Sequence, residues 1–164
     1  MADAALNAVH PELPAGIDPD SVVRGSFGAH DHPTLGVDAA AEWLGYEVSE
    51  YADGYARAHM VLRDEMLNGF KIAHGGMIFA FGDTCFAWSC NDPRGDGSTI
   101  TVASGVDINF ISSPVAGTRL TAVGVRRSST GRSGIYDITI TDDEGGLVAE
   151  FRGRSRTIPN KRRA

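Results

Sequence analysis

The pattern of apolar and polar positions predicts one long helix followed by several strands. From Met77 to Cys90 the apolar residues cover every face of a 3.6-residue period, which is typical of a helix surrounded by protein rather than lying on a surface. After residues 91–95 the period changes to two. This alternation predicts strands over Thr99–Ile111, Arg119–Arg127, Gly134–Thr141 and Leu147–Thr157.

Shorter elements precede the long helix. An amphipathic helix is predicted at Val37–Leu44 and two strands at Tyr46–Tyr51 and Tyr55–Leu62, with Asp53-Gly54 suited to the tight turn between them. This order of elements predicts an α+β fold in which one antiparallel sheet wraps around the long helix. In the strand after the long helix, one side is expected to carry Val102, Val106, Ile108 and Phe110.

The length of 164 residues predicts a single domain. Residues 1–36 contain several prolines and glycines and no sustained apolar period, so they are expected to form a mostly irregular extension. The folded domain is placed at residues 37–158. Residues 159–164 are expected to form a short basic tail.

Charge is unevenly distributed along the chain, which has a net charge of −6. Up to Thr118 there are 5 basic and 16 acidic residues, whereas from Arg119 on there are 10 basic and 5 acidic ones. An acidic total argues against nucleic acid as a partner. The basic last third could meet a small phosphorylated ligand or could be a solvated sheet face. With no apolar run long enough for a bilayer and no signal-peptide pattern, a cytoplasmic protein that makes no membrane contact is expected.

Asp83 is the only acidic residue in the long predicted helix. A buried carboxylate is paired, neutral or retained for chemistry, because burial of an unpartnered charge is costly. Asp83 could therefore attack an electrophile or activate a water molecule, or it could be held by neighbouring hydroxyls or amides. Cys85 and Cys90 are five residues apart and have no metal-ligand spacing, so neither a disulfide nor a metal site is predicted.

Gly75 and Gly76 open the helix directly after His74. Glycines permit a sharp turn, and they also leave backbone N–H groups bare at the positive end of the helix dipole, where an oxyanion or a polarised carbonyl can bind. His74 is expected to fix the turn through its side chain, with a direct acid–base role as the alternative. Asn68-Gly69 has, in isolation, the composition of a turn.

Several short motifs occur in a characteristic order and spacing. Asn68-Gly69 is followed by His74-Gly75-Gly76 and Asp83-Thr84, and the later strands contain Gly134–Ile138 and Phe151–Ser155. Over about residues 39–158 these motifs resemble the hotdog-fold acyl-CoA thioesterases of the PaaI type, which belong to the phenylacetate degradation pathway. One departure is Gly82, where this family usually has Ala.

The resemblance implies a hotdog subunit, with its antiparallel sheet wrapped around one long central helix. Such subunits form homo-oligomers, dimers or dimers of dimers, with active sites along the dimer seam. The implied reaction is hydrolysis of phenylacetyl-CoA, or of a hydroxylated or ring-modified relative, to the free acid and coenzyme A. It uses no metal and no cofactor, since coenzyme A is part of the substrate.

The same resemblance implies roles for individual residues. Asp83 is the nucleophile or general base, the Gly75 N–H is the oxyanion donor, and Asn68 holds water or the thioester oxygen. Thr84 and Ser104 would add hydroxyls beside the reacting centre or satisfy their own backbone. The other implied substrate-binding residues are His74 and Gly76 at the helix start and, at a turn that borders the coenzyme A phosphates, Arg127, Ser129, Gly131 and Arg132.

Two other functions remain open at this point. A hotdog hydratase or dehydratase normally uses a His and a carboxylate as an acid–base pair, but here His74 is on a turn and Asp83 is inside the helix. A non-catalytic acyl-CoA sensor would need a DNA-reading segment, and the acidic, proline-broken residues 1–36 do not resemble one.

Overall fold

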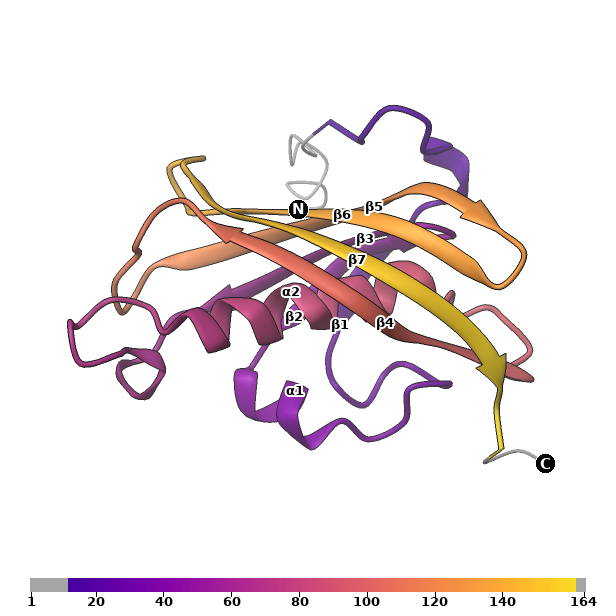
Figure 1. The fold of residues 1–164 in the computed structure, drawn as a ribbon, viewed down its shortest axis with the longest axis horizontal. Coiled ribbons are helices and arrows are strands. Elements are labelled where there is room, and N and C mark those ends of the chain that lie inside the picture. The colour runs from indigo at the N-terminus through magenta and orange to yellow at the C-terminus, as the bar shows by residue number, and fades with distance from the viewer. Residues whose placement is uncertain (1–11, 162–164) are drawn as a thin grey trace, which may run out of the picture.

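The long predicted helix is α2 (Gly75–Cys90), and a seven-stranded antiparallel sheet curls around it (Figure 1). The computed structural model describes residues 12–161. The predicted α+β architecture is confirmed. In spatial order, the strands are β1 (Val23–Phe27), β2 (Glu47–Ala52), β3 (Tyr55–Val61), β5 (Arg119–Thr130), β6 (Ser133–Thr141), β7 (Leu147–Pro159) and β4 (Thr99–Phe110).

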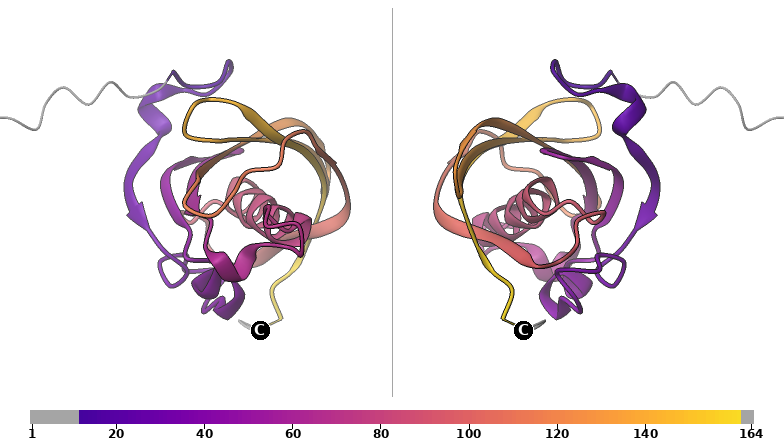
Figure 2. Two further views of the ribbon diagram at one scale, coloured as in Figure 1. Left: turned by 90° about the vertical axis from the view of Figure 1, so that its left-hand side faces the viewer. Right: turned by 90° about the vertical axis from the view of Figure 1, so that its right-hand side faces the viewer.

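The sheet covers one side of α2 (Figure 2). Gly82 lies where helix and sheet approach closely, because a Cβ there would be 3.1 Å from the Phe151 ring and 3.3 Å from Ile140. The missing side chain thus lets α2 lie close to β6 and β7. The large side chains that α2 buries beneath the sheet are Ile78, Phe81, Phe86 and Trp88.

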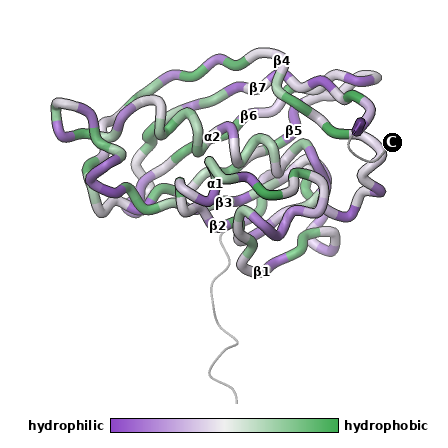
Figure 3. Tube along the Cα trace, turned by 90° about the horizontal axis from the view of Figure 1, so that it is seen from below, coloured by the Kyte–Doolittle hydropathy of each residue, from purple (hydrophilic) through white to green (hydrophobic). Residues whose placement is uncertain are grey.

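The opposite side of α2 is left open by residues 12–161 of a single chain. Helix α1 (Ala39–Leu44) lies beside α2, as the view from below shows (Figure 3), but it leaves a stripe of α2 uncovered. The prediction of a helix covered on every face is therefore wrong for the isolated subunit. An open apolar stripe on a central helix indicates that another surface covers it. Its residues are Gly75, Met77, Phe79, Ala80, Asp83, Thr84 and Ala87.

The N-terminal extension is more ordered than the sequence predicts. β1 pairs with β2 and becomes the edge strand of the sheet, and the ring of Phe27 lies 5.2 Å from that of Tyr51. The prediction of an irregular extension is thus wrong for residues 23–27; residues 1–11 and 162–164 lie outside the described residues. β1 forms because a sheet edge is available to pair with, which a local pattern of prolines and glycines does not reveal.

Residues 13–22, which include a short 3-10 turn at Pro19–Ser21, pack on the outer face of the sheet, the face turned away from α2. Beneath them, Glu50 and Arg57 form a buried ion pair of 3.0 Å, and Tyr55 donates its hydroxyl hydrogen to Glu50. This segment therefore covers the β2–β3 end of the outer face. Its apolar contacts join Leu13, Ile17 and Val22 to Ala52, Tyr55 and Val125.

Two strand details differ from the predictions. A bulge between Ala103 and Gly105 reverses the alternation of β4, so Val102 pairs opposite Arg156 and faces outward, away from the side of Val106. β5 continues to Thr130, which leaves a turn of only two residues at 131–132. Ser129, which was expected in the turn, therefore belongs to the strand.

Candidate active site

Asp83 lies two turns into α2 on its open side and is half-buried. It makes no hydrogen bond or ion pair with any residue between 12 and 161, so the interpretation of a structural carboxylate held by hydroxyls or amides finds no support. Burial, and to a lesser extent the negative charge of Asp38, raises the pKa of Asp83. An unpaired carboxylate with a raised pKa is available as a base or nucleophile.

The start of α2 leaves one backbone N–H without an acceptor among the described residues. The Gly76 N–H donates to Nδ1 of His74 at 3.0 Å, while the N–H groups of Met77 and Ile78 donate to the His74 carbonyl. Within residues 12–161, only the Gly75 N–H of this first turn has no partner. It points from the positive end of the helix dipole, which suits an oxyanion.

His74 is the N-cap residue of α2. Its Nδ1 accepts the hydrogen bond from Gly76, and that bond requires an unprotonated nitrogen. The expected role in fixing the turn is therefore confirmed. In the neutral imidazole Nε2 then carries the hydrogen, so it can donate to a ligand but cannot serve in the alternative role as a base. His74 also donates its own N–H to the Met66 carbonyl, which joins the loop to the short 3-10 turn Asp64–Met66.

Asn68 begins the loop that leads to the helix. Its Oδ1 accepts the Phe70 N–H at 2.8 Å, and Lys71 adopts a left-handed conformation with φ of 64°. A bridge between Leu67 and Ala73 closes the loop. The side-chain oxygen thus serves the turn, and the Asn68 amide NH₂, which makes no hydrogen bond within residues 12–161, is the part left for a substrate or water.

Thr84 and Ser104 both satisfy nearby backbone. The Thr84 hydroxyl donates to the Ala80 carbonyl at 2.9 Å within α2, and Ser104 donates to the Arg154 carbonyl at 3.0 Å across the sheet. These bonds fit the backbone-satisfying interpretation of both residues. Each oxygen can still accept a hydrogen bond from a ligand.

The β5–β6 hairpin brings several of the expected phosphate-binding residues together. Ser104 and Ser129 line a cavity of about 320 Å³ with Arg154, and Ser129, Gly131 and Arg132 line an adjoining one of about 210 Å³. Gly131 has φ of 57°, as the two-residue turn requires. Among residues 12–161 the Arg132 side chain makes no ion pair, so it is available to an anion.

Arg127 does not join this group. It lies on the outer face, and its Nε donates to Asp137 at 2.9 Å. Arg152 binds the same carboxylate through two further hydrogen bonds, and the two guanidinium groups hold the pKa of Asp137 below its usual range.

A thioesterase superfamily model matches residues 70–149. The acyl-coenzyme A thioesterase PaaI of Escherichia coli (strain K12) is 37% identical over 121 residues, which make up 74% of this chain and 84% of that protein. The chain belongs to the PaaI-type thioesterases. The sequence-based assignment to this family and to its acyl-CoA thioesterase activity is thereby confirmed.

Solved structures agree with this assignment. The E. coli PaaI protein from the phenylacetic acid degradation operon superposes with a TM-score of 0.69, covering 75% of this chain and 86% of that one at 37% identity. A variant of the phenylacetic acid degradation protein PaaI from Thermus thermophilus is 29% identical, with a TM-score of 0.66 and coverages of 73% and 98%. A Streptococcus pneumoniae protein solved with coenzyme A has the same fold, at 21% identity, a TM-score of 0.62 and coverages of 70% and 90%.

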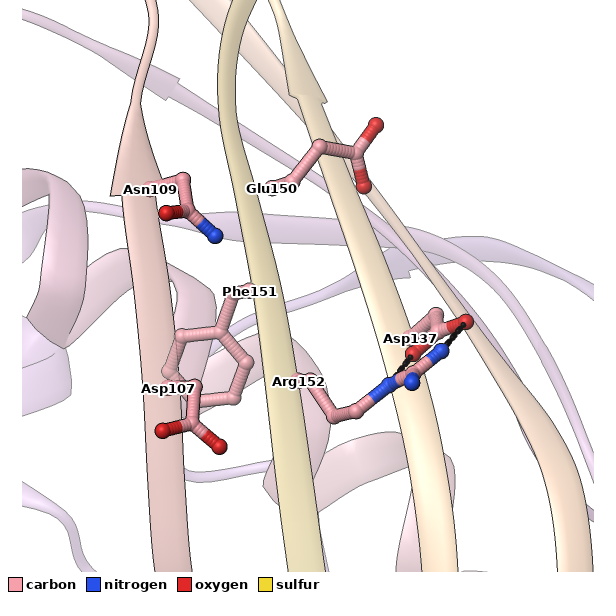
Figure 4. Close-up of a pocket in the computed structure, with 6 residues that line it drawn as sticks. All are labelled: Asp107, Asn109, Asp137, Glu150, Phe151 and Arg152. Carbon is pink, nitrogen blue, oxygen red and sulfur yellow. Dashed lines mark hydrogen bonds and ion pairs between the residues drawn. The ribbon is translucent and has the colours of Figure 1, made fainter.

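The outer face of this PaaI-type thioesterase carries a separate groove of about 360 Å³ (Figure 4). Its polar groups come from three strands, and Figure 4 shows the Arg152 guanidinium paired with the Asp137 carboxylate. Carboxylates predominate, so the groove does not suit the phosphates of coenzyme A. None of the expected site residues lines it; its lining is Asp107, Asn109, Asp137, Glu150, Phe151 and Arg152.

Three residues beside the thioesterase site were not predicted to belong to it. Asp38 lies in the predicted helix Val37–Leu44, Arg154 in the predicted strand Leu147–Thr157, and Phe110 among the residues expected on one side of the strand after the long helix, and none was given a role in the site. Their sequence signals are those of ordinary structural positions, and only folding places them near Asp83, Ser104 and Gly75 respectively. No helix in residues 12–161 is long and apolar enough to cross a membrane, and no three potential metal ligands gather within that range.

Proposed function

We propose that this PaaI-type thioesterase hydrolyses phenylacetyl-CoA, or a hydroxylated or ring-modified relative, with Asp83 as nucleophile or general base. The observation that carries the proposal is the pairing of two unused groups on the open side of α2. Asp83 is half-buried and unpaired within the described residues, and Gly75 keeps the only unpartnered N–H of the first helical turn. The relatives named for phenylacetic acid degradation support the aryl-acyl substrate.

The reaction adds water across the thioester bond. Attack on the carbonyl carbon moves negative charge onto the carbonyl oxygen, where the Gly75 N–H and the helix dipole stabilise it; one such donor is worth about 3–4 kcal/mol. The C–S bond then breaks and coenzyme A leaves as the thiol. As a general base, Asp83 takes a proton from water and returns it to the sulfur. As a nucleophile, it forms an anhydride that water then hydrolyses.

Two subunits are needed to complete the site. An oxyanion donor and an attacking group must both lie about 3 Å from one carbonyl group. Gly75 and Asp83 of one chain are eight residues apart, or about 12 Å along the helix axis. We therefore assign the Gly75 N–H and the Asp83 carboxylate of each site to different subunits.

A two-fold axis near Phe79 would achieve this pairing. Phe79 lies midway between Gly75 and Asp83, and 37% of its side chain is exposed. Antiparallel α2 helices related by an axis there would place Gly75 of one subunit opposite Asp83 of the other. β4 is an edge strand of twelve residues and offers backbone groups for pairing with its copy.

Asp83→Asn tests the chemistry. This variant keeps the shape of the side chain but removes the charge, the nucleophile and the base, so kcat should fall by about 10² or more while acyl-CoA still binds. Release of free coenzyme A from phenylacetyl-CoA measures turnover, and a thermal melt of the same preparation measures folding. Asp143→Asn, which changes an exposed turn carboxylate, is the matched control.

The melting temperature of Asp83→Asn should stay level or rise, because a neutral amide costs less to bury than an unpaired carboxylate. A stable variant with wild-type turnover would contradict the catalytic role of Asp83. Mass-spectrometric analysis of an acyl-CoA panel separates the thioesterase from the two alternative functions. A hydratase changes the mass of the acyl group without releasing coenzyme A. A sensor leaves the acyl-CoA intact.

A further inference from the structure

Phe110 reaches the start of α2 from the last position of β4. A Cβ on Gly75 would lie 3.1 Å from Cζ of Phe110 and 3.4 Å from Cε1 and Cε2, so the tip of the ring rests against the Gly75 α-carbon. The ring is on the inner face, because Phe110 pairs opposite the buried Ala149 of β7. The regular β4–β7 register thus sets its position.

The Phe110 ring is only partly buried by the rest of the subunit. Its side chain is 49% exposed, although its tip touches Gly75. Contact through the tip leaves the two faces of the ring available. The only unpartnered N–H of the α2 start within residues 12–161 is therefore bordered by the open part of this ring. A few polar groups within apolar walls are typical of a small-molecule site.

We propose that Phe110 determines the acyl specificity of this thioesterase by packing its ring against the aryl part of the substrate. The inference rests on the proposed function, because it takes the Gly75 N–H as the donor to the thioester carbonyl. The acyl group begins at that carbonyl carbon, and in an arylacetyl thioester the aromatic ring is only one methylene away. The ring of the substrate therefore falls within reach of Phe110.

Aromatic pairs have a geometric preference that an alkyl chain does not share. Offset or edge-to-face pairs, with ring centres about 4.5–7 Å apart, are favoured beyond the area that they bury. A straight acyl chain of similar length would gain the free energy of burying apolar surface but not the additional attraction between two aromatic rings. Phe110 thus favours aryl-acyl over alkyl-acyl thioesters at the same carbonyl position.

Phe110→Leu tests this inference. The measured quantity is the ratio of kcat/KM for phenylacetyl-CoA to kcat/KM for hexanoyl-CoA, which should fall about fivefold on loss of the aromatic pair. Phe110→Tyr should restore most of the wild-type ratio, because the ring is retained. Phe70→Leu is the control: the same change is made on a loop side chain that is 86% exposed, and the ratio should not change.

Two outcomes would overturn the inference. One is a ratio that folded Phe110→Leu leaves unchanged; if kcat/KM then falls equally for both substrates, Phe110 supports the helix start rather than determining specificity. The other is a wild-type preference for hexanoyl-CoA. Failure of the proposed function can be told apart from failure of the Phe110 inference, because the wild type would then release no coenzyme A from phenylacetyl-CoA.

Discussion

At the scale of single residues, Asp83 shows how its surroundings adjust the proposed catalytic carboxylate. Burial disfavours the ionised form and raises the pKa, and the Asp38 carboxylate near the start of α1 adds to the rise. Since the folded-state pKa exceeds the unfolded one, the Asp83 contribution to stability is present at low pH and lost as pH rises through the folded pKa. The ionised form that catalysis needs is therefore the form that the fold disfavours.

Asp38→Asn should shift the pH dependence of the reaction. Asn is also a good N-cap, so α1 should persist, while loss of the negative charge lowers the pKa of Asp83. The acidic limb of kcat/KM for phenylacetyl-CoA, which rises with pH as Asp83 ionises, should move to lower pH. Asp20→Asn, on the N-terminal segment, is the control. An acidic limb that stays in place would remove Asp38 from the electrostatics of the site.

At the scale of elements, His32 connects the N-terminal segment to the end of α2 through a hydrogen bond and a ring contact. The imidazole is 1% exposed and packs edge-on against Trp88 at 4.7 Å. Its Nδ1 accepts the N–H groups of Thr34 and Leu35, so Nε2 carries the hydrogen and donates to the Asn91 carbonyl at 2.7 Å. The neutral imidazole alone fits this arrangement, and burial lowers its pKa even though the nearby Asp92 opposes the shift.

Acid should therefore loosen this contact. Because the folded-state pKa lies below the ordinary value, the stabilisation by neutral His32 is present above about pH 6.5 and is lost as pH falls through the folded pKa, by at most about 1.4 kcal/mol per pH unit. Urea unfolding between pH 8 and pH 5 measures the loss. His32→Gln should be less stable than the wild type at pH 8 but should lose less stability on acidification.

His30→Gln, which changes an exposed histidine of the same segment, is the control for that measurement. Equal acid sensitivity of the wild type and His32→Gln would contradict the assigned role of His32.

At the scale of the whole molecule, the open side of α2 and the edge strand β4 are the surfaces that the proposed second copy would cover. Gly75→Pro removes the proposed oxyanion donor. Proline is favoured at the first position of a helix, and His74 already has the extended conformation that a following proline needs, with φ of −67° and ψ of 128°. The variant should fold, with the exposed part of Phe110 allowing the ring to shift, and kcat should fall by about 10² to 10³.

Subunit mixing tests whether each site is shared. Gly75→Pro and Asp83→Asn homodimers should both be nearly inactive, whereas a mixed dimer regains one site with an intact Gly75 and an intact Asp83. Equal amounts, unfolded and refolded together, should recover about a quarter of wild-type turnover. No recovery in a mixture shown by native mass spectrometry to contain mixed dimers would place both groups of each site in one chain. A monomeric mass at micromolar concentration would also contradict the shared site.

The sequence alone determined the architecture and indicated which residues to propose as the reacting groups. The change of period from 3.6 to two located α2 and the strands after it, because side-chain direction repeats with the backbone geometry of each element. Asp83 and the two helix-start glycines were identifiable because a carboxylate inside an apolar helix, and bare N–H groups at its start, are anomalies of local chemistry. The motif spacing then indicated the family.

Only the tertiary structure decided what depends on contacts between distant segments. β1 forms by pairing with an edge that residues 47–52 supply, and the β4 bulge turns Val102 outward through its register with β7. Arg127 is directed to Asp137 on the outer face, and Phe110 is brought against Gly75. These positions follow from strand register and packing across the sheet, which no local period specifies, whereas the helix and the carboxylate in its apolar sequence are properties of a continuous stretch of chain.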